Sequence, residues 1–509
     1  MAFFRSKPGL LILLSAVLFA VAVMFAQFYL AWFCLLPYFA ATDRQRGRAA
    51  LRSGLWLGSS FCAILLYWMP SLISDFTGSL LLGIVVYAAA IVIAMLYFGL
   101  LAWCMAWFPR DSRSPWINAL WIASVWVIGE WLLSTALPGM PWFGLFRISN
   151  IVLDNLYAIQ AAAFGGSYLL SFFIVFVNYL LAQYIIRRQW PMMAVPLGLV
   201  LGYMAAGYGI LYRFEQQYAG TDKPVTIAIL CDNTTPDTKW NNENGSFLVK
   251  RLLDLNVKAA AIKPDIALWT EAVVPWTYRA DDDFIKTVLN TTAPQGITHI
   301  MGMTTPCNDK AIYNSAYCLL PDGKVSGRYD KHYPVSLAEK PWGFLALPFG
   351  GSAAARFQEM EGLSPLPLPT PYGKVGVLIC NDGTVPGATL AQVRNGARFL
   401  VSLSNDAWFS HVSCLVRQHY LNTRLRAVEV RKDMAINCNM GASGLVSASG
   451  KAQIAPVADD SFVTPVSVYS NKYLTAYASF PLLSIYVCTV LVLIFIFINV
   501  YSKKPKHTQ

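Results

Sequence analysis

Three segments of the chain end in residues that could share one reaction. Glu271 follows an apolar run in "IALWTEA", Lys331 lies in the polar "GRYDKHYPV", and Cys380 ends "KVGVLIC" directly before "NDG". Turn formers after an apolar run place the cysteine where a buried strand meets a turn. The ends of parallel strands are where such sheets present functional groups. A carboxylate, an ammonium and a thiol are the components of thiol acyl-transfer chemistry.

In such chemistry the carboxylate takes the thiol proton and later returns it to the leaving group. The cation favours the thiolate and stabilises the oxyanion of a tetrahedral intermediate, together with the backbone N–H that follows the cysteine. Taken alone, Cys380 would more often be a small buried apolar residue, and Glu271 and Lys331 would more often be surface charges. Their combination favours the catalytic interpretation.

The sequence does not favour two other kinds of site. No histidine–cysteine pair has the spacing of a zinc site, and the five histidines are scattered. The G-x-S-x-G motif of a serine nucleophile does not occur in the sequence. We therefore expect neither a metal ion nor a cofactor.

The segments around these residues predict an α/β layered domain with a mixed sheet. Apolar strand-like runs are separated by helical stretches such as 244–262 and 387–397, and this alternation is typical of layered α/β folds. The runs lie at 225–231, 266–272, 297–305, 316–320, 374–380 and 398–406. Glu271 and Cys380 belong to the ends of two of these runs.

The rest of the chain has the composition of a membrane protein. Of the 509 residues, 56% are hydrophobic and only 13% are charged, whereas soluble domains carry about 25% charged residues. Several apolar runs approach the roughly 20 residues that cross a bilayer. They lie at 9–40, 54–74, 81–108, 117–137, 162–186, 191–212 and 481–500, and we interpret the first as a pair of short helices. This predicts eight crossings within residues 1–212 and 481–509, and a globular domain over 213–480.

Basic residues orient these helices, because cytoplasmic loops are enriched in Lys and Arg. Such residues flank the first run at 5–7 and 44–52, recur in "PRDSRSP" and "IIRRQW", and end the chain in "YSKKPKHTQ". This places both termini in the cytoplasm and residues 213–480 outside it. The net charge of +11 is then a consequence of topology, and we expect no nucleic-acid partner. A cleaved signal peptide followed by seven crossings is the alternative.

Short motifs along the chain carry a family resemblance. Glu in "LWTEAVVP", Lys in "YDKHYPVSLAEK" and Cys in "VGVLICND", in that order, resemble the nitrilase superfamily. With membrane helices on both sides, the chain is similar to the bacterial apolipoprotein N-acyltransferases over essentially its full length. The further matching motifs are "GEWLL" (129–133), "PGMPW" (138–142), "KW" (239–240), "YNSA" (313–316), "LSNDAWF" (403–409) and "RLRAVEV" (424–430).

The resemblance implies a fold and a reaction. The fold is a polytopic α-helical membrane domain with an extracytoplasmic nitrilase-like αββα sandwich. In the reaction, the thiol takes an acyl chain from a phospholipid and releases a lysophospholipid. The α-amine of an S-diacylglyceryl-cysteine apolipoprotein then takes the acyl chain from the thioester, in a ping-pong sequence. The resemblance also implies the bacterial inner membrane, a periplasmic catalytic domain and, we expect, a monomer.

Site residues follow from the resemblance by position. Glu271 would be the general base, Lys331 the oxyanion cation and Cys380 the nucleophile. Glu339 matches the family's second carboxylate near the site. Trp240 matches its lid tryptophan, although an interfacial anchor is the alternative interpretation of this residue.

The sequence also departs from the family pattern. The usual Cys-Tyr-Glu is Cys380-Asn381-Asp382, so the aromatic ring is lost and the carboxylate is one methylene shorter. The residue before the general base is Thr270 in place of Pro, and "NDAWF" is followed by Ser410 in place of Gly. "FGLFRISN" replaces the family's Gly-Tyr-Ser-Gln. We interpret these changes as altered substrate handling. A membrane-tethered amidase and a catalytically weakened lipoprotein-binding paralogue are the alternatives.

Further candidates lie outside this set. Cys307 and Cys318 flank a predicted hairpin and are the best disulfide candidates in an oxidising compartment. Asp406 is expected to cap a turn. Within the membrane region, Glu130 and Arg147 are either functional or interfacial. We expect His332 and His411 to be polar surface residues.

Overall fold

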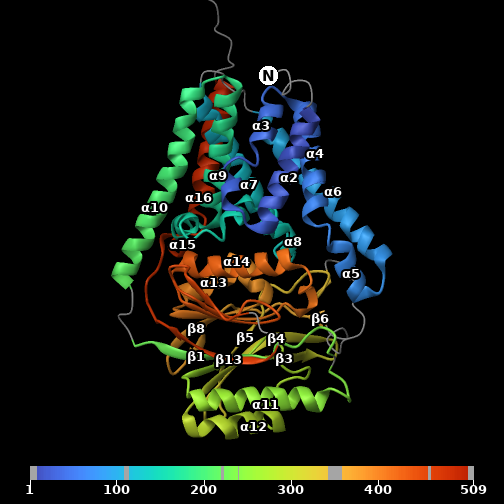
Figure 1. Cartoon of the computed structure of the whole chain (residues 1–509), viewed down its shortest axis with the longest axis vertical. Coiled ribbons are helices and arrows are strands. Elements are labelled where there is room, and N and C mark those ends of the chain that lie inside the picture. The colour runs from blue at the N-terminus through green and yellow to red at the C-terminus, as the bar shows by residue number, and fades with distance from the viewer. Residues whose placement is uncertain are drawn as a thin grey trace, which may run out of the picture. The chain divides into compact units, whose positions relative to one another are not determined.

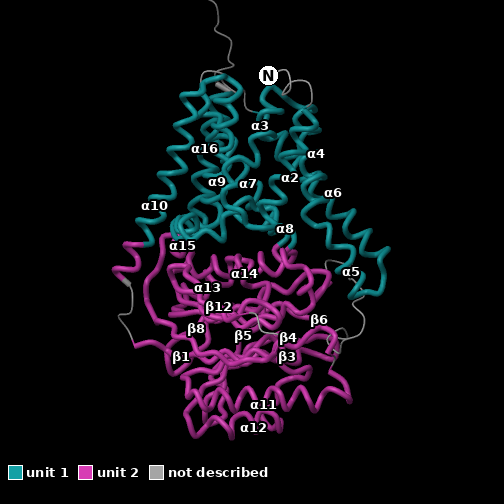
Figure 2. The backbone as a smooth tube through the Cα atoms, viewed as in Figure 1, with its two compact units in different colours: residues 1–137, 142–211, 480–509 teal, residues 138–141, 212–479 magenta. Residues whose placement is uncertain are grey.

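The structure is a computed structural model that describes residues 8–107, 114–218, 223–238, 240–341, 358–456 and 460–501. It divides into two compact units (Figure 2). The helical unit consists of Met1–Leu137, Trp142–Leu211 and Phe480–Gln509, and the α/β unit of Pro138–Pro141 and Tyr212–Ser479. The basic residues at 5–7 and in "PRDSRSP" up to 113, Lys239 and the basic tail lie outside the described residues.

The helical unit consists of long apolar helices joined by short ones. Its α-helices are α2 (Pro8–Phe25), α3 (Leu36–Thr42), α4 (Gly47–Leu65), α5 (Met69–Thr77), α6 (Leu80–Trp107), α7 (Pro115–Ala136), α8 (Pro141–Gly144), α9 (Ala162–Ile186), α10 (Ala194–Tyr218) and α16 (Leu483–Tyr501). Its 3₁₀ helices are η1 (Phe28–Trp32), η2 (Ile148–Val152), η3 (Ala158–Ala161) and η4 (Trp190–Met193).

The number of apolar helices agrees roughly with the eight expected crossings. Within the described ranges, five helices are long and apolar enough to cross a membrane, and α4 and α5 add one span bent by 54°. Shorter apolar segments at Phe28–Thr42 and Leu483–Asn499 complete the set. The bend was not predicted. Pro70 lies in the first turn of α5, where a residue without an N–H is tolerated at a helix start but cannot continue α4.

Small residues let α4 and α6 pack closely. Gly54 and Gly58 lie one turn apart on α4, and a Cβ atom on either would come within 2.4 Å of a carbonyl oxygen of α6. Small residues at this spacing are typical of helix contacts in lipid, where backbones must approach closely for dispersion contacts to hold them together.

Glu130 is buried inside the helical unit. Its Oε1 atom accepts hydrogen bonds from Trp126 Nε1 at 2.9 Å and from the Ile148 N–H at 2.8 Å. The second bond satisfies an N–H at the start of η2, which has no partner within its own helix. Arg147 is also buried, and its Nε atom donates to the Gly144 carbonyl at 3.3 Å.

The α/β unit contains two sheets. Strand order in the seven-stranded sheet is β13-β1-β2-β3-β4-β5, with β6 paired to β4, and in the six-stranded sheet it is β12-β11-β10-β9-β8-β7. The strands are β1 (Val225–Cys231), β2 (Ile266–Leu268), β3 (Thr298–Asn308), β4 (Ala311–Leu319), β5 (Val325–Asp330), β6 (Gln358–Glu359), β7 (Leu368–Thr370), β8 (Gly373–Ile379), β9 (Phe399–Asn405), β10 (Met434–Asn439), β11 (Gly444–Val446), β12 (Ala452–Ile454) and β13 (Phe462–Val468). Parallel pairing of β1 with β2, β2 with β3, β8 with β9 and β9 with β10 confirms the mixed sheet.

The α/β unit has four layers, two sheets between two layers of helices, because side chains along each strand alternate between the two faces of its sheet. The helices are α11 (Gly245–Ile262), α12 (Asp283–Thr292), α13 (Pro386–Arg394), α14 (Ser413–Val430) and α15 (Ala476–Ser479). On β1, Ile227 packs between the sheets, whereas Ala228 packs outward with residues of α11 and α12. On β8, Ile379 packs between the sheets, and Leu378 packs outward with residues of α13 and α14. Figure 1 shows these helix pairs on opposite sides of the sheets. The predicted αββα sandwich is confirmed.

The predicted pairing of Cys307 with Cys318 is wrong. Both thiols are free, Cys307 being exposed and Cys318 buried. In the β3–β4 hairpin, Cys318 lies opposite Ile300, which is seven residues before Cys307 along β3. Seven residues of strand span roughly 23 Å, whereas disulfide-bonded Cα atoms lie within about 7 Å.

Candidate active site

Cys380 lies at a sharp turn between a strand and a helix. Strand β8 ends at Ile379, Cys380 opens the 3₁₀ turn η7 (Cys380–Thr384), and α13 follows. Cys380 is buried and has φ = +47°. A left-handed conformation at a residue other than glycine costs on the order of 1–3 kcal/mol and persists only where surrounding contacts impose it. Such strained residues are concentrated at functional sites.

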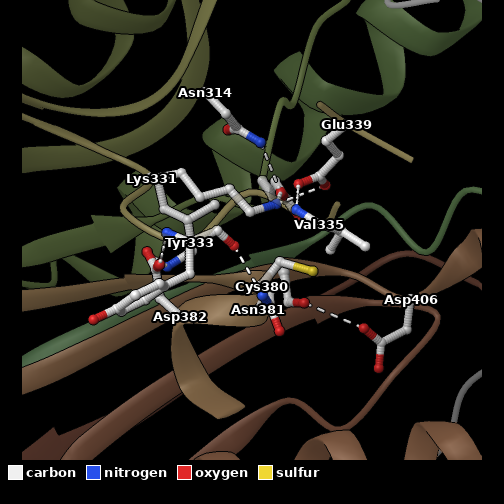
Figure 3. A network of polar contacts seen from close by, with 12 residues as sticks. Asn314, Lys331, Tyr333, Val335, Glu339, Cys380, Asn381, Asp382 and Asp406 are labelled. Atoms are coloured by element: carbon white, nitrogen blue, oxygen red, sulfur yellow. Dashed lines mark hydrogen bonds and ion pairs between the residues drawn. The ribbon is translucent and has the colours of Figure 1, made fainter. Parts of the chain in front are cut away.

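Lys331 follows β5 directly and is fully buried between two carboxylates. Its Nζ atom donates to Glu271 Oε1 at 3.1 Å and to Glu339 Oε1 at 2.7 Å. Burial lowers the pKa of Lys331, but the charges of Glu271 and Glu339 outweigh it and raise that pKa well above the ordinary value. Lys331 is therefore a permanent cation. Figure 3 shows Lys331 and Glu339 pointing toward each other beside the thiol of Cys380.

Both carboxylates are held by further donors. Glu271, three residues after β2, accepts at Oε1 from Asn314 Nδ2 at 2.8 Å. Glu339 accepts at Oε2 from the Val335 N–H at 2.7 Å. Burial raises the pKa of Glu271, and Lys331 opposes this effect. A carboxylate with a raised pKa is closer to the proton affinity that a general base needs near neutral pH.

Cys380 is a protonated thiol in the resting site. Burial, together with the nearby charge of Glu271, raises its pKa well above the ordinary value, although Lys331 opposes the shift. The sequence led us to expect that the cation would favour a thiolate. Here burial and the carboxylates outweigh that attraction, so the proton must be removed during the reaction.

Asp382 connects the segment carrying Lys331 with the segment carrying Cys380. Its carboxylate accepts from Tyr329 Oη at 2.8 Å, from the N–H groups of His332 at 3.2 Å and Tyr333 at 2.8 Å, and from the Ile379 N–H at 3.2 Å. These donors lie on both sides of Lys331 and directly before Cys380. The fully buried carboxylate therefore fixes the two backbones relative to each other.

Asn381 contributes to the same connection. Its Nδ2 atom donates to the Tyr333 carbonyl at 2.9 Å, and its Oδ1 atom accepts from Thr384 Oγ1 at 2.7 Å. The side chain is buried and engaged with protein groups. Asn381 thus takes part in holding the turn.

The structure does not bring Trp240 into this polar cluster. Its ring meets Trp276 edge-on, with ring centroids 5.8 Å apart, and packs on the outer hydrophobic cluster under α11 and α12. Cys380 belongs to the cluster between the sheets.

Two residues at the site were missed, and one was misinterpreted. Asp406 does not cap the following turn, because Asn405 Oδ1 accepts from the Ala407 N–H at 3.1 Å, and the Asp406 carboxylate instead meets His419. The sequence contains no motif that predicts a role for His419, and its one local feature is Thr423, which follows it by one helical turn. Glu359 comes from the short strand β6, and no local pattern predicts its nearness to Lys331.

The two histidines expected on the polar surface differ. His332 is half-buried, with Nδ1 2.7 Å from the Gly362 carbonyl, whereas His411 is exposed.

Glu359 is the third carboxylate near Lys331. Burial first, and then the charge of Glu339, raise its pKa well above the ordinary value, and Lys331 opposes them. Its Oε2 atom is buried and makes no hydrogen bond to any described residue. Burial thus favours the neutral acid at Glu359, which, unlike Glu271 and Glu339, forms no ion pair with Lys331 within the described residues.

Two family models match this chain. The family model for the apolipoprotein N-acyltransferase N-terminal domain matches residues 15–180, and the carbon-nitrogen hydrolase model matches residues 238–456. A carbon-nitrogen hydrolase structure from Helicobacter pylori aligns over 54% of this chain and 94% of its own at 15% identity, with a TM-score of 0.37. The fold assignment rests on the strand order, the layers and the family match.

Curated relatives match both units together. The apolipoprotein N-acyltransferase of Geobacter metallireducens is 28% identical over 436 residues, which cover 83% of this chain and 81% of that protein. The one from Vibrio parahaemolyticus is 25% identical over 426 residues, covering 79% of each. One family model lies in the helical unit and the other in the α/β unit. The chain therefore belongs to the bacterial apolipoprotein N-acyltransferase family, a membrane-bound branch of the nitrilase superfamily.

Proposed function

We propose that the chain transfers a fatty acyl chain from a phospholipid, through a thioester on Cys380, to the N-terminal amine of an S-diacylglyceryl-cysteine apolipoprotein. The observation that carries this proposal is the buried Lys331, held between Glu271 and Glu339 beside a strained cysteine. The helical unit supports a lipid substrate, because a simple membrane tether needs one span and this chain has several.

The first half-reaction acylates the thiol. Glu271 takes the proton of Cys380 as the sulfur attacks the ester carbonyl of the phospholipid. The oxyanion that forms is stabilised by Lys331 and by the backbone N–H of Asn381, at the start of η7. When the C–O bond breaks, Glu271 returns the proton to the departing lysophospholipid oxygen, which leaves a thioester and a free glycerol hydroxyl.

The second half-reaction transfers the acyl chain to nitrogen. The free amine of the acceptor attacks the thioester carbonyl, and Glu271 takes a proton from that nitrogen. Lys331 again stabilises the oxyanion. The C–S bond then breaks, and the sulfur recovers a proton from Glu271. An amide is formed, and Cys380 returns to its thiol form.

The roles of the remaining site residues follow from their contacts. Glu339 fixes Lys331, while Asp382 and Asn381 hold the turn that carries the nucleophile. For Trp240 we propose a lid role in another conformation of the loop that carries it. The chain is a bacterial membrane protein, and we propose that its α/β unit faces the periplasm, with residues 8 and 501 toward the cytoplasm, because basic loops favour that side.

Mass spectrometry of the purified chain tests the proposal. In detergent with a phospholipid carrying an isotope-labelled acyl chain, we expect that acyl mass on the Cys380 peptide and an equal amount of lysophospholipid. A synthetic lipopeptide beginning with S-diacylglyceryl cysteine should then remove the adduct and become N-acylated. Cys380→Ser should lose both steps, whereas Cys307→Ser, which changes an exposed thiol, should retain them.

The same experiment separates the alternatives. An acyl adduct that is released as free fatty acid, without N-acylated lipopeptide, would indicate a membrane-bound hydrolase. Binding of the lipopeptide with no adduct on Cys380 would indicate a non-catalytic lipoprotein-binding protein.

A further inference from the structure

A histidine–carboxylate pair holds the backbone of Cys380. His419, on α14, places its Nε2 atom 3.2 Å from the Cys380 carbonyl oxygen. Its Nδ1 atom lies 2.9 Å from Asp406 Oδ1 and 3.1 Å from Oδ2. Asp406 is almost fully buried and also accepts from Ser404 Oγ at 3.2 Å. The pair thus connects the end of β9 to the strained residue that carries the thiol.

Both partners of the imidazole are hydrogen-bond acceptors. A neutral imidazole has one N–H and one bare nitrogen, so it could donate to the carboxylate or to the carbonyl, but not to both. The two contacts are hydrogen bonds together only when both ring nitrogens carry a proton. The geometry therefore describes an imidazolium. Consistently, burial lowers the pKa of His419, but Asp406 and the Cys380 carbonyl outweigh it and raise that pKa above its usual range.

Helix α14 packs closely against the turn that follows Cys380. At Gly383, a Cβ atom would lie 2.4 Å from Thr423 Oγ1, so only glycine permits this close approach. Thr423 Oγ1 in turn donates to the His419 carbonyl at 3.0 Å. The same packing therefore positions both the backbone of His419 and the turn that begins at Cys380.

We propose that His419, supported by Asp406, is the positioning residue of the nucleophile: its Nε2–H donates to the Cys380 carbonyl, holds Cys380 in the left-handed conformation and thereby aims the thiol at Glu271 and Lys331. The imidazole contacts the backbone of Cys380 and not its sulfur, so Glu271 remains the base. This inference rests on the proposed function, because it concerns the thiol that would carry the acyl chain.

The proposal has a defined pH dependence. The charged groups that face His419 are Asp406 from the end of β9 and Glu271 from the segment after β2, and the titratable thiol belongs to Cys380, whose carbonyl the imidazole contacts. When His419 loses a proton, the carboxylate of Asp406 keeps the hydrogen on Nδ1, because it is the stronger acceptor. Nε2 then becomes a bare nitrogen facing a carbonyl, and the contact that holds Cys380 is lost. Acylation should fall as the pH rises through the raised pKa of His419.

Three variants separate positioning from general stability. In Asp406→Asn, the amide keeps Oδ1 toward Ser404 and turns Nδ2 toward the imidazole. The neutral imidazole then accepts at Nδ1 and donates from Nε2, so the contact to Cys380 survives. In His419→Gln, an amide that donates to the Cys380 carbonyl must turn its oxygen toward Asp406. The double variant rebuilds the chain of donors, because the amide nitrogen introduced by Asp406→Asn can donate to that oxygen.

The measurement is single-turnover acylation of Cys380 by a phospholipid. A second assay uses a short p-nitrophenyl ester, whose burst of p-nitrophenol reports acylation without lipid recognition. We expect His419→Gln to slow both by roughly 10- to 100-fold, Asp406→Asn by less than about 3-fold at pH 7, and the double variant to recover most of the loss. Asp406→Asn should also remove the decline at high pH. His411→Ala, which changes an exposed imidazole, is the control and should leave the rates unchanged.

Additive losses in the double variant would overturn the inference, as would an Asp406→Asn variant that is slower than His419→Gln. Absence of a burst from wild type with the activated ester would overturn it as well, because Cys380 would not be a nucleophile. The same variant pattern with the activated ester, but no acylation from phospholipid, would support the positioning role and reject the proposed function.

Discussion

The two units differ in which side chains they expose and which they bury. In the helical unit, large apolar side chains are exposed along whole helices, as with Leu81 at 72% and Leu201 at 71%. In the α/β unit, charged side chains are buried: Lys331 is 0% exposed, Glu271 and Asp382 are buried near it, and Asp406 is buried near Cys380. Exposed apolar helices would be unfavourable in water, and unpaired buried charges would be unfavourable in either unit.

The difference teaches that burial has to be interpreted against the solvent of each unit. Exposed apolar helices are stable where the surrounding solvent is lipid, since the backbone polar groups are already paired within each helix. Buried charges are stable in the α/β unit only because each has opposite charges or several donors. The comparison predicts that a new charge will be most harmful on an exposed helix of the helical unit. A lost charge will be most harmful at the site.

The largest effect should follow from removing the central cation. Lys331→Met leaves Glu271 and Glu339 buried without their shared partner, and we expect acylation to fall by more than about 1,000-fold and the free energy of unfolding to fall by roughly 3–5 kcal/mol. Without the cation, the pKa of Glu271, which burial already raises, rises further, so that Glu271 can take up a proton. Groups with raised pKa contribute stability at low pH that is lost as the pH rises, so the deficit should be larger at pH 8 than at pH 5.

Burst kinetics with an activated ester and thermal unfolding across this pH range measure both effects. Lys324→Met is the matched control, because Lys324 is largely exposed in the same unit. Equal unfolding temperatures for Lys331→Met and wild type at pH 8 would contradict the view that this cation balances two buried carboxylates.

The second effect tests the surface of the helical unit. Leu201→Asp on α10 places a charge on a side chain that is 71% exposed. If this surface faces lipid, the charge should cost roughly 2.5–3.5 kcal/mol in membrane insertion. Val257→Asp on α11 changes a side chain that is 57% exposed, and its cost should stay within about 0.5–1 kcal/mol. Yield of folded protein in the membrane fraction measures the first and thermal unfolding the second. Similar losses for both variants would remove the distinction between the two surfaces.

How far the sequence predicted these features depends on the range of the interactions. The apolar helices, the strand ends at Glu271 and Cys380, and the αββα layers follow from local hydropathy and from family motifs. The contact of Asp406 with His419 and the approach of Glu359 to Lys331 depend on how separate strands and helices pack together, and no local pattern specifies them. The hairpin that Cys307 and Cys318 were expected to flank does form, but its register places Cys318 opposite Ile300 and not near Cys307. The bend between α4 and α5 could have been predicted from Pro70.

The third effect concerns the connection between the two segments of the site. Asp382→Ala leaves Tyr329 Oη and the N–H groups of His332, Tyr333 and Ile379 without their acceptor. An unsatisfied buried donor costs roughly 1–3 kcal/mol. Since these groups position both Lys331 and Cys380, we expect acylation to slow by roughly 10- to 100-fold. Asp382→Asn keeps one acceptor oxygen and should lose less. An Asp382→Ala variant with the wild-type acylation rate would show that the connection does not position the site.

The smallest effect separates two kinds of buried carboxyl group in one site. The raised pKa of Glu359 favours the protonated acid, for which Glu359→Gln substitutes an amide of the same shape, so we expect acylation at pH 7 to change by less than about 3-fold. Glu271→Gln makes the same substitution at the proposed base, which must be ionised to take the thiol proton, and should abolish acylation. Because the folded-state pKa of Glu359 is raised, wild type loses stability as the pH rises above the unfolded pKa, and the glutamine variant does not. Its unfolding temperature should therefore exceed that of wild type at pH 8 and approach it near pH 5. A strong loss of acylation in Glu359→Gln at pH 7 would mean instead that Glu359 is ionised and takes part in the reaction.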